Sequence, residues 1–442
     1  MKRIAYKNLL EWKVSSNRKP LVLQGARQVG KTYLVDEFGK NEYENYIYLN
    51  FEQNNQLLSL FEPSLDPYII IHSLGLYLGK TISAENTLIF FDEIQIAPRV
   101  LTSLKYFQEM APEFHIIAAG SLLGVSINKQ TSFPVGKVSF LTLYPLSFAE
   151  FLTANGEELF VKTLEQLTII SPFPDAIHQK MLHYLKLYFY LGGMPEVVKN
   201  YIEKRKIEEP REIQKEILNA YERDFSKYAD KNQSIKNSEF WNSIPRQLAR
   251  ENKKFKYNEI KKNARAAMYD GAVEWLRKAG LIHLAYNINT PKLPLSAYAD
   301  FAMFKVYFHD VGLLAAKLNI PSSQIVIPDA LFTDFNGAFT ENFVAQELIC
   351  NQNDSIYYWT SNSDAEVDFI IQSDNTIIPL EVKSGTSLNT KSIRSYAEKY
   401  KPEVIMRVSP RNLLQSGNFY NIPLYTLSLL NKPAIFVANN IL

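Results

Sequence analysis

Residues 25–32 read GARQVGKT, and glycine, lysine and threonine at this spacing are the residues that a phosphate-binding loop needs. Gly25 and Gly30 carry no Cβ, so the backbone can fold its N–H groups around an anion without obstruction. Lys31 is placed to reach the β- and γ-phosphate oxygens of a nucleotide, and the Thr32 hydroxyl is placed to bind Mg²⁺. The loop therefore predicts ATP and Mg²⁺ as cofactors, bound through Gly25, Ala26, Arg27, Gln28, Val29, Gly30, Lys31 and Thr32.

The segments on either side of this loop have the patterns that would position it. Residues 20–24 form a short apolar run typical of a strand, and residues 32–39 follow with helical spacing. A bound phosphate would therefore lie at the positive end of the following helix. The simpler alternative is a glycine turn with a solvated lysine, and the strand before it and the helix after it favour nucleotide binding.

A pair of acidic residues ends the second chemically informative segment, TLIFFDEIQ at residues 87–95. Its continuous apolar run is typical of a parallel strand that is buried on both faces. Acids at the carboxyl end of such a strand face the ligand crevice of an open α/β sheet. We expect Asp92 to hold Mg²⁺ and Glu93 to orient or deprotonate the attacking water. The pair favours nucleotide hydrolysis over nucleotide storage.

A third apolar segment, HIIAAGS at residues 115–121, ends in a small polar residue. Ser121 stands where ring-type ATPases keep a polar group that senses the γ-phosphate, so we expect it to belong to the catalytic set. Taken alone, the same serine is equally consistent with a helix cap.

The C-terminal third contains a second constellation that could do chemistry. Asp368 lies in a predicted strand, and Glu381 and Lys383 lie in the next one. Residues i and i+2 of a strand project from the same face, so Glu381 and Lys383 would point together, and Asp368 can converge on them. Asp368 and Glu381 would bind Mg²⁺ at a phosphodiester, while Lys383 positions the water. The alternative is that both acids are buried salt-bridge partners of Lys383.

The order of elements around these residues is more specific than the residues themselves. The sequence predicts a helix, three strands, a helix and a strand, which is the core of the PD-(D/E)xK nuclease fold. The six predicted elements are 337–350, 355–361, 366–372, 376–383, 391–400 and 403–409.

Several sequence blocks, taken in order, resemble the bacterial and archaeal AAA-superfamily ATPases that carry a C-terminal domain of formerly unknown function. The blocks are GARQVGKT, DEIQIAP, AAGSLL, YPLSFAEF, GGMPEVV, YERDF, FKVYFHDVGLL, ENFVAQEL, YYWTSNSDAEVDFII and IIPLEVKSG. They extend over almost the whole chain. The first two occur in many nucleotide hydrolases, whereas the ordered set is specific to this group.

The resemblance implies further roles. A helical lid would follow the ATPase sheet, copies of the chain would assemble with one another, and Glu341 would supply a third acid, as in resolvase-like nucleases. The chain departs from the group at Lys137, where many relatives have an arginine. A lysine lacks the planar fork of an arginine finger, so this role is not assigned to Lys137.

Residues 236–330 resemble a winged helix, with three helical segments followed by two strands, 281–288 and 302–310, that could pair as the wing. Residues 250–265 contain seven basic and two acidic residues, a local excess suited to a phosphate backbone. In such folds the third helix, here residues 269–279, enters the major groove. Protein docking and a merely solvated basic face are the alternatives.

Bulk composition excludes several classes of protein. The 48 basic and 46 acidic residues give a net charge of +2, so any basic surface must be local. The single cysteine, Cys350, excludes a disulfide framework and a cysteine-rich zinc site. The chain has neither a signal-peptide pattern nor an apolar run long enough for a membrane span, so we expect no membrane partner and a cytoplasmic location.

The predicted fold class is α/β. We expect a P-loop NTPase parallel sheet over residues 1–155, a helical lid at 156–235, a winged-helix domain at 236–330 and a PD-(D/E)xK-like α/β domain at 331–442. The predicted function is a Mg²⁺-dependent ATPase coupled to DNA binding, with DNA cleavage as a further activity. The alternative is a regulatory switch, in which ATP turnover drives self-association or protein docking and the nuclease-like domain is catalytically silent.

Overall fold

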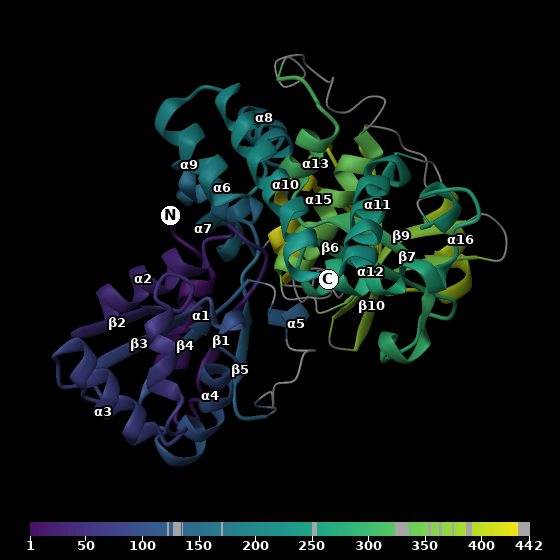
Figure 1. Ribbon diagram of the computed structural model, residues 1–442. Helices are drawn as coiled ribbons and strands as arrows, with labels where there is room; N and C mark the ends of the chain where they lie inside the picture. Colours follow the sequence, from purple (N-terminus) through teal and green to yellow (C-terminus); the bar gives the residue numbers. More distant parts are fainter. Residues whose placement is uncertain are drawn as a thin grey trace. The chain divides into compact units, whose positions relative to one another are not determined.

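The computed structural model divides the chain into two compact units (Figure 1). Unit 1 comprises residues 1–144 and 278–281, and unit 2 comprises residues 145–277 and 282–442. The structure describes residues 1–121, 123–126, 134, 136–168, 171–249, 254–322, 336–351, 355–361, 365–373, 375–385 and 391–431.

Unit 1 is built on a parallel sheet of five strands in the order β2-β3-β4-β1-β5. The three strands predicted at 20–24, 87–95 and 115–121 are present as β1 Leu21–Gln24, β3 Thr87–Asp92 and β4 His115–Ala119, and β2 Asn45–Asn50 and β5 Ser139–Thr142 complete the sheet. Every residue of β3 is buried, as expected for a strand covered on both faces. Because β4 pairs with both β1 and β3, the ends of these three strands lie next to one another.

The helices of unit 1 alternate with its strands, in the pattern that a parallel sheet requires. They are α1 Ala5–Val14, α2 Lys31–Glu42, α3 Pro67–Leu78, α4 Pro98–Met110 and the short α5 Leu123–Ser126, with 3₁₀ turns η1 Asn55–Phe61 and η2 Ile94–Ile96. Ile70 of α3 and Leu104 of α4 pack in one buried cluster with Phe91 of β3. This packing fixes the strand end at which Asp92 stands.

Unit 2 begins with the helices that the sequence predicts for residues 156–235. Gly192, Gly193 and Pro195 separate two of them, since one helix ends at Leu191 and the next begins at Pro195. Helices in the first half of unit 2 are α6 Phe148–Ala154, α7 Glu158–Gln166, α8 Asp175–Leu191, α9 Pro195–Lys204, α10 Glu209–Tyr228, α11 Lys231–Leu248 and α12 Ala266–Lys278, with 3₁₀ turn η3 Tyr257–Glu259.

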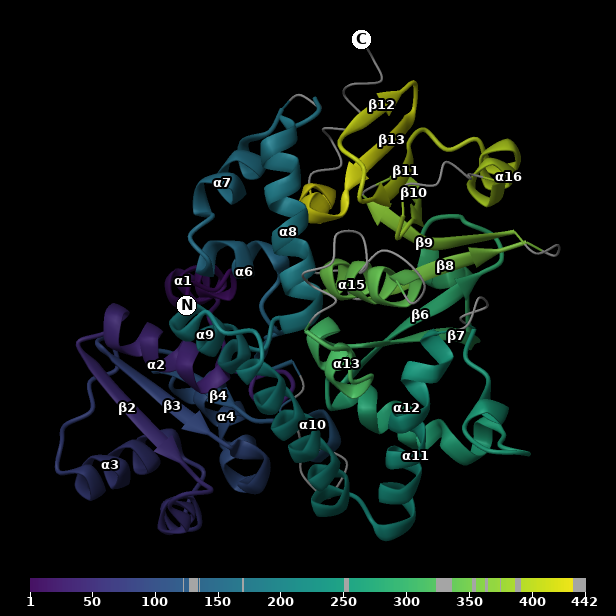
Figure 2. The same ribbon diagram turned by 90° about the horizontal axis from the view of Figure 1, so that it is seen from above.

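The second half of unit 2 is a mixed sheet of eight strands in the order β12-β13-β11-β10-β9-β8-β6-β7 (Figure 2). The strands are β6 Ile282–Ile288, β7 Ala299–Phe308, β8 Ile356–Thr360, β9 Glu366–Ser373, β10 Thr376–Val382, β11 Ile405–Ser409, β12 Leu414–Ser416 and β13 Phe419–Pro423. The associated helices are α13 Val311–Lys317, α15 Asn336–Cys350 and α16 Lys391–Tyr400, with η4 Leu295–Tyr298 and η6 Leu424–Asn431. The predicted order of a helix, three strands, a helix and a strand is present as α15, β8, β9, β10, α16 and β11.

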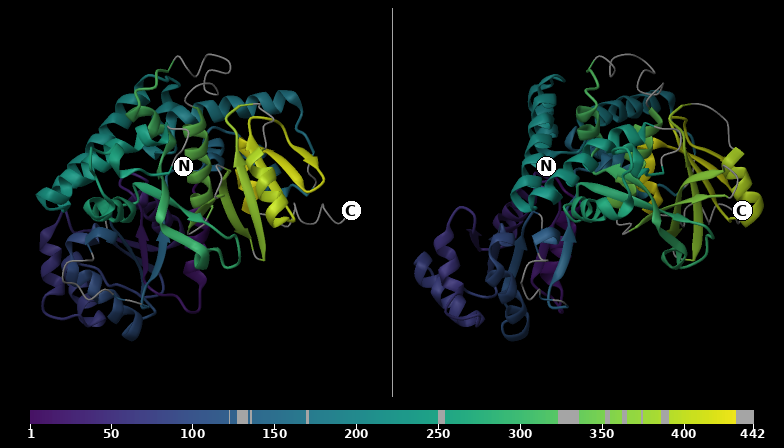
Figure 3. Two further views of the ribbon diagram at one scale, coloured as in Figure 1. Left: turned by 90° about the vertical axis from the view of Figure 1, so that its right-hand side faces the viewer. Right: turned by 45° about the vertical axis from the view of Figure 1, so that its right-hand side comes forward.

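Strands β6 and β7 pair with each other in antiparallel fashion, as expected for a wing, but β6 also pairs with β8 in parallel. The green and yellow strands therefore continue in one sheet (Figure 3). This sheet contains strands from both of the regions predicted as separate domains, 236–330 and 331–442. Six of the seven residues of β6 are buried. Because buried backbone N–H and C=O groups need hydrogen-bond partners, β6 requires a neighbouring strand on each of its edges.

Helix α15 anchors several parts of unit 2 through buried polar side chains. The Asn342 amide accepts from Phe308 N (2.7 Å) and donates to Phe308 O (3.1 Å). The Gln346 amide accepts from Val311 N (2.9 Å) and donates to Tyr188 Oη (2.7 Å). Helix α15 thus fixes the end of β7, the start of α13 and the side chain of Tyr188 on α8.

The turn between α8 and α9 is held by Asp310. Its carboxylate accepts from Leu313 N at 2.8 Å, which caps α13, and from Gly193 N at 2.6 Å. A Cβ on Gly193 would lie 2.0 Å from Leu146 O, so the close approach of the two backbones requires glycine. The family-like blocks at residues 144–151, 192–198 and 304–314 therefore meet in one buried region.

None of the helices in the described part of the chain combines the length and the hydropathy that a bilayer crossing requires.

A buried carboxyl on α15 makes the stability of unit 2 depend on pH. Glu347 is 2% exposed and accepts from Phe148 N at 2.9 Å. Burial raises its pKa to about 8, although the hydrogen bond from Phe148 N opposes the shift. The folded state therefore keeps a proton that the unfolded state releases between about pH 4.5 and 8, and stability falls as pH rises through that interval.

We predict that Glu347→Gln raises the free energy of unfolding at pH 8 by about 1–3 kcal/mol, because glutamine accepts the same hydrogen bond without a charge to bury. At pH below about 4.5 the two proteins should be equally stable. Urea denaturation at both pH values measures the difference. An equal effect of the substitution at the two values would contradict the assignment.

Candidate functional site

The loop at residues 25–30 has the backbone that the sequence predicts. Gly25 has φ of 143°, and a Cβ there would lie 2.1 Å from Leu143 O, so the chain after β5 leaves room for glycine alone. Gly30 caps α2 with φ of 91°, and Gln28 adopts φ of 65°. These left-handed conformations curl the loop at the N-terminus of α2, where backbone N–H groups are available to an anion.

Lys31 lies across this loop. Its ammonium donates to Gly25 O (3.0 Å) and Ala26 O (2.8 Å), and the residue is 8% exposed. Burial lowers the pKa of Lys31 to about 8, while the nearby Glu93 and Asp92 favour the charged form. A phosphate group is the kind of partner that would restore its full charge.

The two predicted Mg²⁺ ligands are in direct contact. Thr32 Oγ1 donates to Asp92 Oδ2 at 2.9 Å, across the gap between α2 and the end of β3. Tyr48 Oη on β2 donates to the same oxygen at 3.0 Å, and Asp92 Oδ1 accepts from Glu93 N at 3.0 Å. Burial, followed by the charge of Glu93, raises the pKa of Asp92. A hydroxyl and a carboxylate are hard oxygen donors, so this pair fits Mg²⁺.

The other predicted catalytic residues lie at neighbouring strand ends. Glu93 has φ of 56°, and its carboxylate accepts from Gln95 Nε2. Ser121, 2% exposed at the end of β4, accepts from Arg27 Nε of the loop at 3.3 Å. The structure thus brings Ser121 to the phosphate-binding loop, where a γ-phosphate sensor would have to stand.

Three residues that position this site were missed by the sequence reasoning. Arg3 Nη1 donates to Val29 O (2.9 Å) and Arg3 Nη2 to Tyr144 O (2.6 Å), so the N-terminal segment fastens the loop. Tyr48 and Gln95 hold the two acids. No local pattern marks Arg3 or Tyr48, because each acts through a partner that is distant in sequence. Gln95 lies two residues after Glu93 in the segment 87–95, so its closeness to that acid is a signal that could have found it.

Lys137, to which no arginine-finger role was assigned from the sequence, forms an ion pair with an acid of α4. Its ammonium pairs with Glu109 at 3.0 Å, and this contact lowers the pKa of Glu109.

Three residues of the C-terminal constellation come together on adjacent strands. The register of β9 and β10 pairs Phe369 with Leu380, which sets Asp368 and Glu381 side by side. Asp368 Oδ2 accepts from Val382 N at 2.8 Å, and Glu381 Oε1 forms an ion pair with Lys383 Nζ at 2.9 Å. Glu381 Oε2 is buried without a hydrogen-bond partner among the described residues. The structure therefore contains the salt bridge that the simpler interpretation predicts, and one oxygen remains for a cation.

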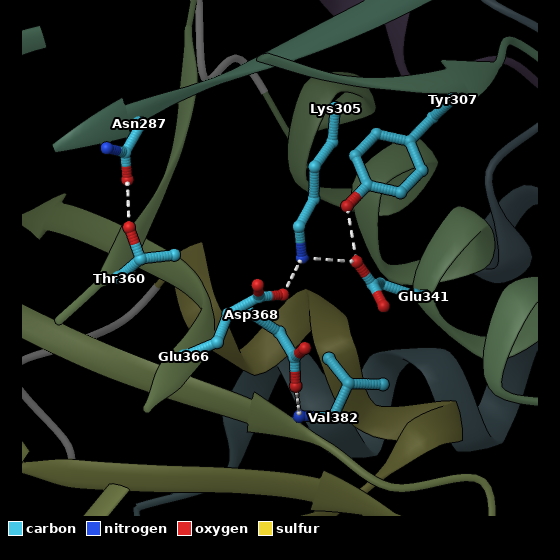
Figure 4. Close-up of polar contacts among 8 residues, drawn as sticks. All are labelled: Asn287, Lys305, Tyr307, Glu341, Thr360, Glu366, Asp368 and Val382. Atoms are coloured by element: carbon cyan, nitrogen blue, oxygen red, sulfur yellow. Dashed lines mark hydrogen bonds and ion pairs between the residues drawn. The ribbon is translucent and has the colours of Figure 1, made fainter. Parts of the chain in front are cut away.

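Glu341, expected as a third acid of this group, has a different set of partners. Its Oε1 accepts from Lys305 Nζ at 2.9 Å and from Tyr307 Oη at 2.5 Å (Figure 4). Lys305 also pairs with Glu366. In the described part of the chain, no group of three or more His, Cys, Asp and Glu side chains is arranged to hold a metal ion.

The basic segment before α12 is partly exposed. Lys256, Lys262 and Arg265 face solvent, whereas Lys261 pairs with Glu239 at 3.1 Å. Arg250 and Lys253 lie outside the described residues. The helix predicted at residues 269–279 is α12, and it buries Tyr269, Ala272, Val273, Trp275 and Leu276. Its Arg277 is held by Glu274 through two hydrogen bonds of 2.9 Å, so the exposed surface of α12 is not strongly basic.

Comparison with known families separates the chain into three matched regions. Residues 17–152 match a family model described as an AAA domain. Residues 182–324 and 336–427 each match a model described as a domain of unknown function, DUF8612 and DUF4143 respectively. A search of curated proteins gave no match.

Solved structures with related features are distant. A Walker-type ATPase of Pyrococcus abyssi has 15% identity and a TM-score of 0.44, covering 72% of this chain and 95% of that chain. Cdc6p of Pyrobaculum aerophilum has 9% identity and a TM-score of 0.25, covering 72% and 94%. The Orc1 protein of Aeropyrum pernix in complex with DNA has 12% identity and a TM-score of 0.26, covering 73% and 92%. At these TM-scores the likeness supports no argument about this chain.

The sheet order, the loop geometry and the Thr32–Asp92 contact agree with the match of the N-terminal region. Residues 17–152 are thus similar to an AAA domain and have the parallel sheet and the loop of a P-loop ATPase fold.

Proposed function

We propose that this protein binds Mg·ATP at the loop of unit 1 and hydrolyses it, and that nucleotide turnover is coupled to association of unit 2 with DNA. The observation that carries the ATPase proposal is the hydrogen bond from Thr32 Oγ1 to Asp92 Oδ2. It joins the loop to the acidic strand end and gathers the oxygen ligands for one cation.

The residues of the site divide the chemistry among them. Backbone N–H groups of residues 25–30 and the ammonium of Lys31 would bind the phosphates, and Thr32 and Asp92 would hold Mg²⁺, which supplies charge at the phosphate oxygens. Glu93, positioned by Gln95, would orient the attacking water and accept its proton. Ser121 would report the γ-phosphate to Arg27 through their shared hydrogen bond.

The DNA part of the proposal rests on the exposed basic side chains that precede α12. The net charge of the whole chain is only +2, so a surface that attracts DNA must be a local one. Such a local group of exposed basic side chains is formed by Lys256, Lys262 and Arg265. Helix α12 buries its apolar face in unit 2, and its Arg277 is neutralised by Glu274. We therefore expect the basic side chains before α12 to contact the phosphate backbone of DNA, rather than α12 to read base edges.

Cleavage of DNA stays a prediction. Asp368, Glu381 and Lys383 lie on adjacent strands, which supports it, but the salt bridge between Glu381 and Lys383 equally supports a silent domain. Mg²⁺-dependent cleavage of linear, single-stranded and four-way-junction DNA that is abolished in Asp368→Ala would establish the activity. Intact ATP turnover without cleavage of any substrate would favour the regulatory switch.

We predict that Glu93→Gln lowers kcat for ATP hydrolysis by about 10²–10⁴-fold while Mg·ATP still binds, because the amide cannot accept the proton of water. Lys31→Ala should weaken binding itself. Phosphate-release kinetics and nucleotide-binding titrations measure the two effects. The matched control for Lys31→Ala is Lys40→Ala, which removes an exposed lysine from the same helix, α2. Unchanged turnover in Glu93→Gln would remove this residue from the mechanism.

We also predict that Mg·ADP binding takes up a proton at about pH 9. Most of the Lys31 side chains are neutral there when the pKa is about 8, and a bound phosphate recharges them. Calorimetric titrations in two buffers of different ionisation enthalpy give the number of protons. Lys31→Arg is the control, since its guanidinium stays charged at this pH. Binding without proton uptake in the wild-type protein would show that Lys31 is already charged in the free protein.

For DNA association, we predict that replacing Lys256, Lys262 and Arg265 by alanine weakens binding to duplex DNA. The slope of log K against log salt concentration should become less steep by about two to three, because that number of phosphate contacts is lost. Fluorescence anisotropy at several salt concentrations measures both quantities. The control replaces three other exposed lysines of unit 2, Lys162, Lys180 and Lys199, so that net charge changes equally. Equal losses in the two triple variants would indicate only a general charge effect.

A further inference from the structure

The edge strand β7 contains a bulge where it pairs with β6. Tyr286 of β6 pairs with Phe304, but the next residue of β6, Asn287, pairs with Asp300. Residues 301–303 of β7 therefore have no counterpart in β6. Bulges are frequent at sheet edges, where they redirect side chains, and β7 is the last strand of its sheet. The bulge releases these three residues from the regular alternation of the strand.

The bulge presents an aromatic side chain to solvent. Phe301 is 63% exposed, although a buried phenylalanine would stabilise the fold. Its ring packs in an edge-to-face manner against Tyr286 of β6, with ring centroids 4.9 Å apart. Asp300 Oδ1 accepts from Ala302 N at 3.0 Å, which fixes the backbone on either side of Phe301. The exposed ring is therefore held in place by a second ring and by the backbone of the bulge.

The basic segment that precedes α12 is attached to β7 beside this bulge. Phe255 N donates to Phe304 O at 2.9 Å, and the rings of the same two residues stack with centroids 5.5 Å apart. Phe304 follows Phe301 by three residues, so their Cα atoms are at most about 11 Å apart. Lys256, the residue after Phe255, is exposed. An exposed ring and an exposed cation thus lie on the same edge of the sheet.

This combination fits the two chemical groups that a single strand of DNA exposes. An unpaired base has a π-face that stacks on an aromatic side chain, and the adjoining phosphate is attracted by a lysine. In a duplex the faces of the bases are covered by their neighbours, so a paired base must first be unstacked. A two-fold contact with a second copy of the chain is less favourable, because it would bring two copies of the basic segment toward each other.

We propose that Phe301, supported by Tyr286, is a stacking site for an unpaired base of DNA, and that Lys256 binds a phosphate of the same strand. The site selects single-stranded or tailed DNA over a blunt duplex. This inference rests on the proposed association of unit 2 with DNA, for which it names the class of substrate. It requires neither ATP turnover nor DNA cleavage.

The test measures binding of the full chain to three oligonucleotides by fluorescence anisotropy. They are a single strand without self-complementarity, a blunt duplex of the same length, and that duplex with a single-stranded tail. Phe301→Ala should weaken binding to the single strand and to the tailed duplex by about 5- to 100-fold, because one stacked base is lost. Binding to the blunt duplex should be unchanged, since its bases are stacked on one another.

Three further variants separate stacking from other effects of the substitution. Phe301→Leu keeps an apolar side chain without a π-face, so it should bind the single strand as weakly as Phe301→Ala does. Phe301→Trp should retain binding, and the single strand should quench the fluorescence of the introduced indole, because the four natural tryptophans are buried. Leu414→Ala removes an exposed apolar side chain from β12, the opposite edge strand, and should leave binding to all three oligonucleotides unchanged.

The outcomes distinguish this inference from the proposed function on which it rests. Equal affinity of the wild-type chain and Phe301→Ala for the single strand would overturn the stacking site and leave the association with DNA standing. A wild-type chain that binds none of the three oligonucleotides would refute the association with DNA and this inference together. Sedimentation without DNA tests the remaining occupant: self-association that is lost in Phe301→Ala, with single-strand binding unchanged, would assign Phe301 to a contact between copies and overturn the proposal.

Discussion

Helix α15 carries buried polar side chains, and the architecture of unit 2 depends on the partners that Asn342, Gln346 and Glu347 have on other elements. An unpaired polar group in a protein interior costs on the order of 1–3 kcal/mol. Asn342 and Gln346 meet this requirement with backbone groups at the end of β7 and the start of α13, and Gln346 also bonds to Tyr188 on α8. Because these partners lie on different elements, α15 joins β7, α13 and α8 to one another.

The same requirement explains why the family-like blocks are spread along the sequence. Gly193 approaches the backbone of Leu146, Asp310 bonds to Gly193, and Glu347 accepts from Phe148. These contacts join segments separated by up to 199 residues. A change in any one block would leave a buried donor or acceptor in another without its partner.

Two lysines illustrate how burial can prepare a side chain for opposite tasks. Lys31 is buried against backbone carbonyls with two acids nearby, and its pKa is lowered to about 8. Lys305 is buried between carboxylates that contact it directly, and its pKa is raised. The first gains from an incoming anion, whereas the second already has its counter-ions inside the fold.

Local sequence determined the elements of unit 1 and the loop at residues 25–30. The apolar run before Gly25, the helical spacing after Thr32 and the apolar strand ending at Asp92 depend on neighbouring residues, so their patterns can be read directly. The order of helices and strands along the C-terminal core could be predicted in the same way, because each element has its own local pattern. What tertiary structure decided was which distant groups meet. The register and sheet order alone bring Thr32 to Asp92, join β6 to β8 and direct Glu341 to Lys305, since such pairings arise from packing and charge balance between elements far apart in the chain.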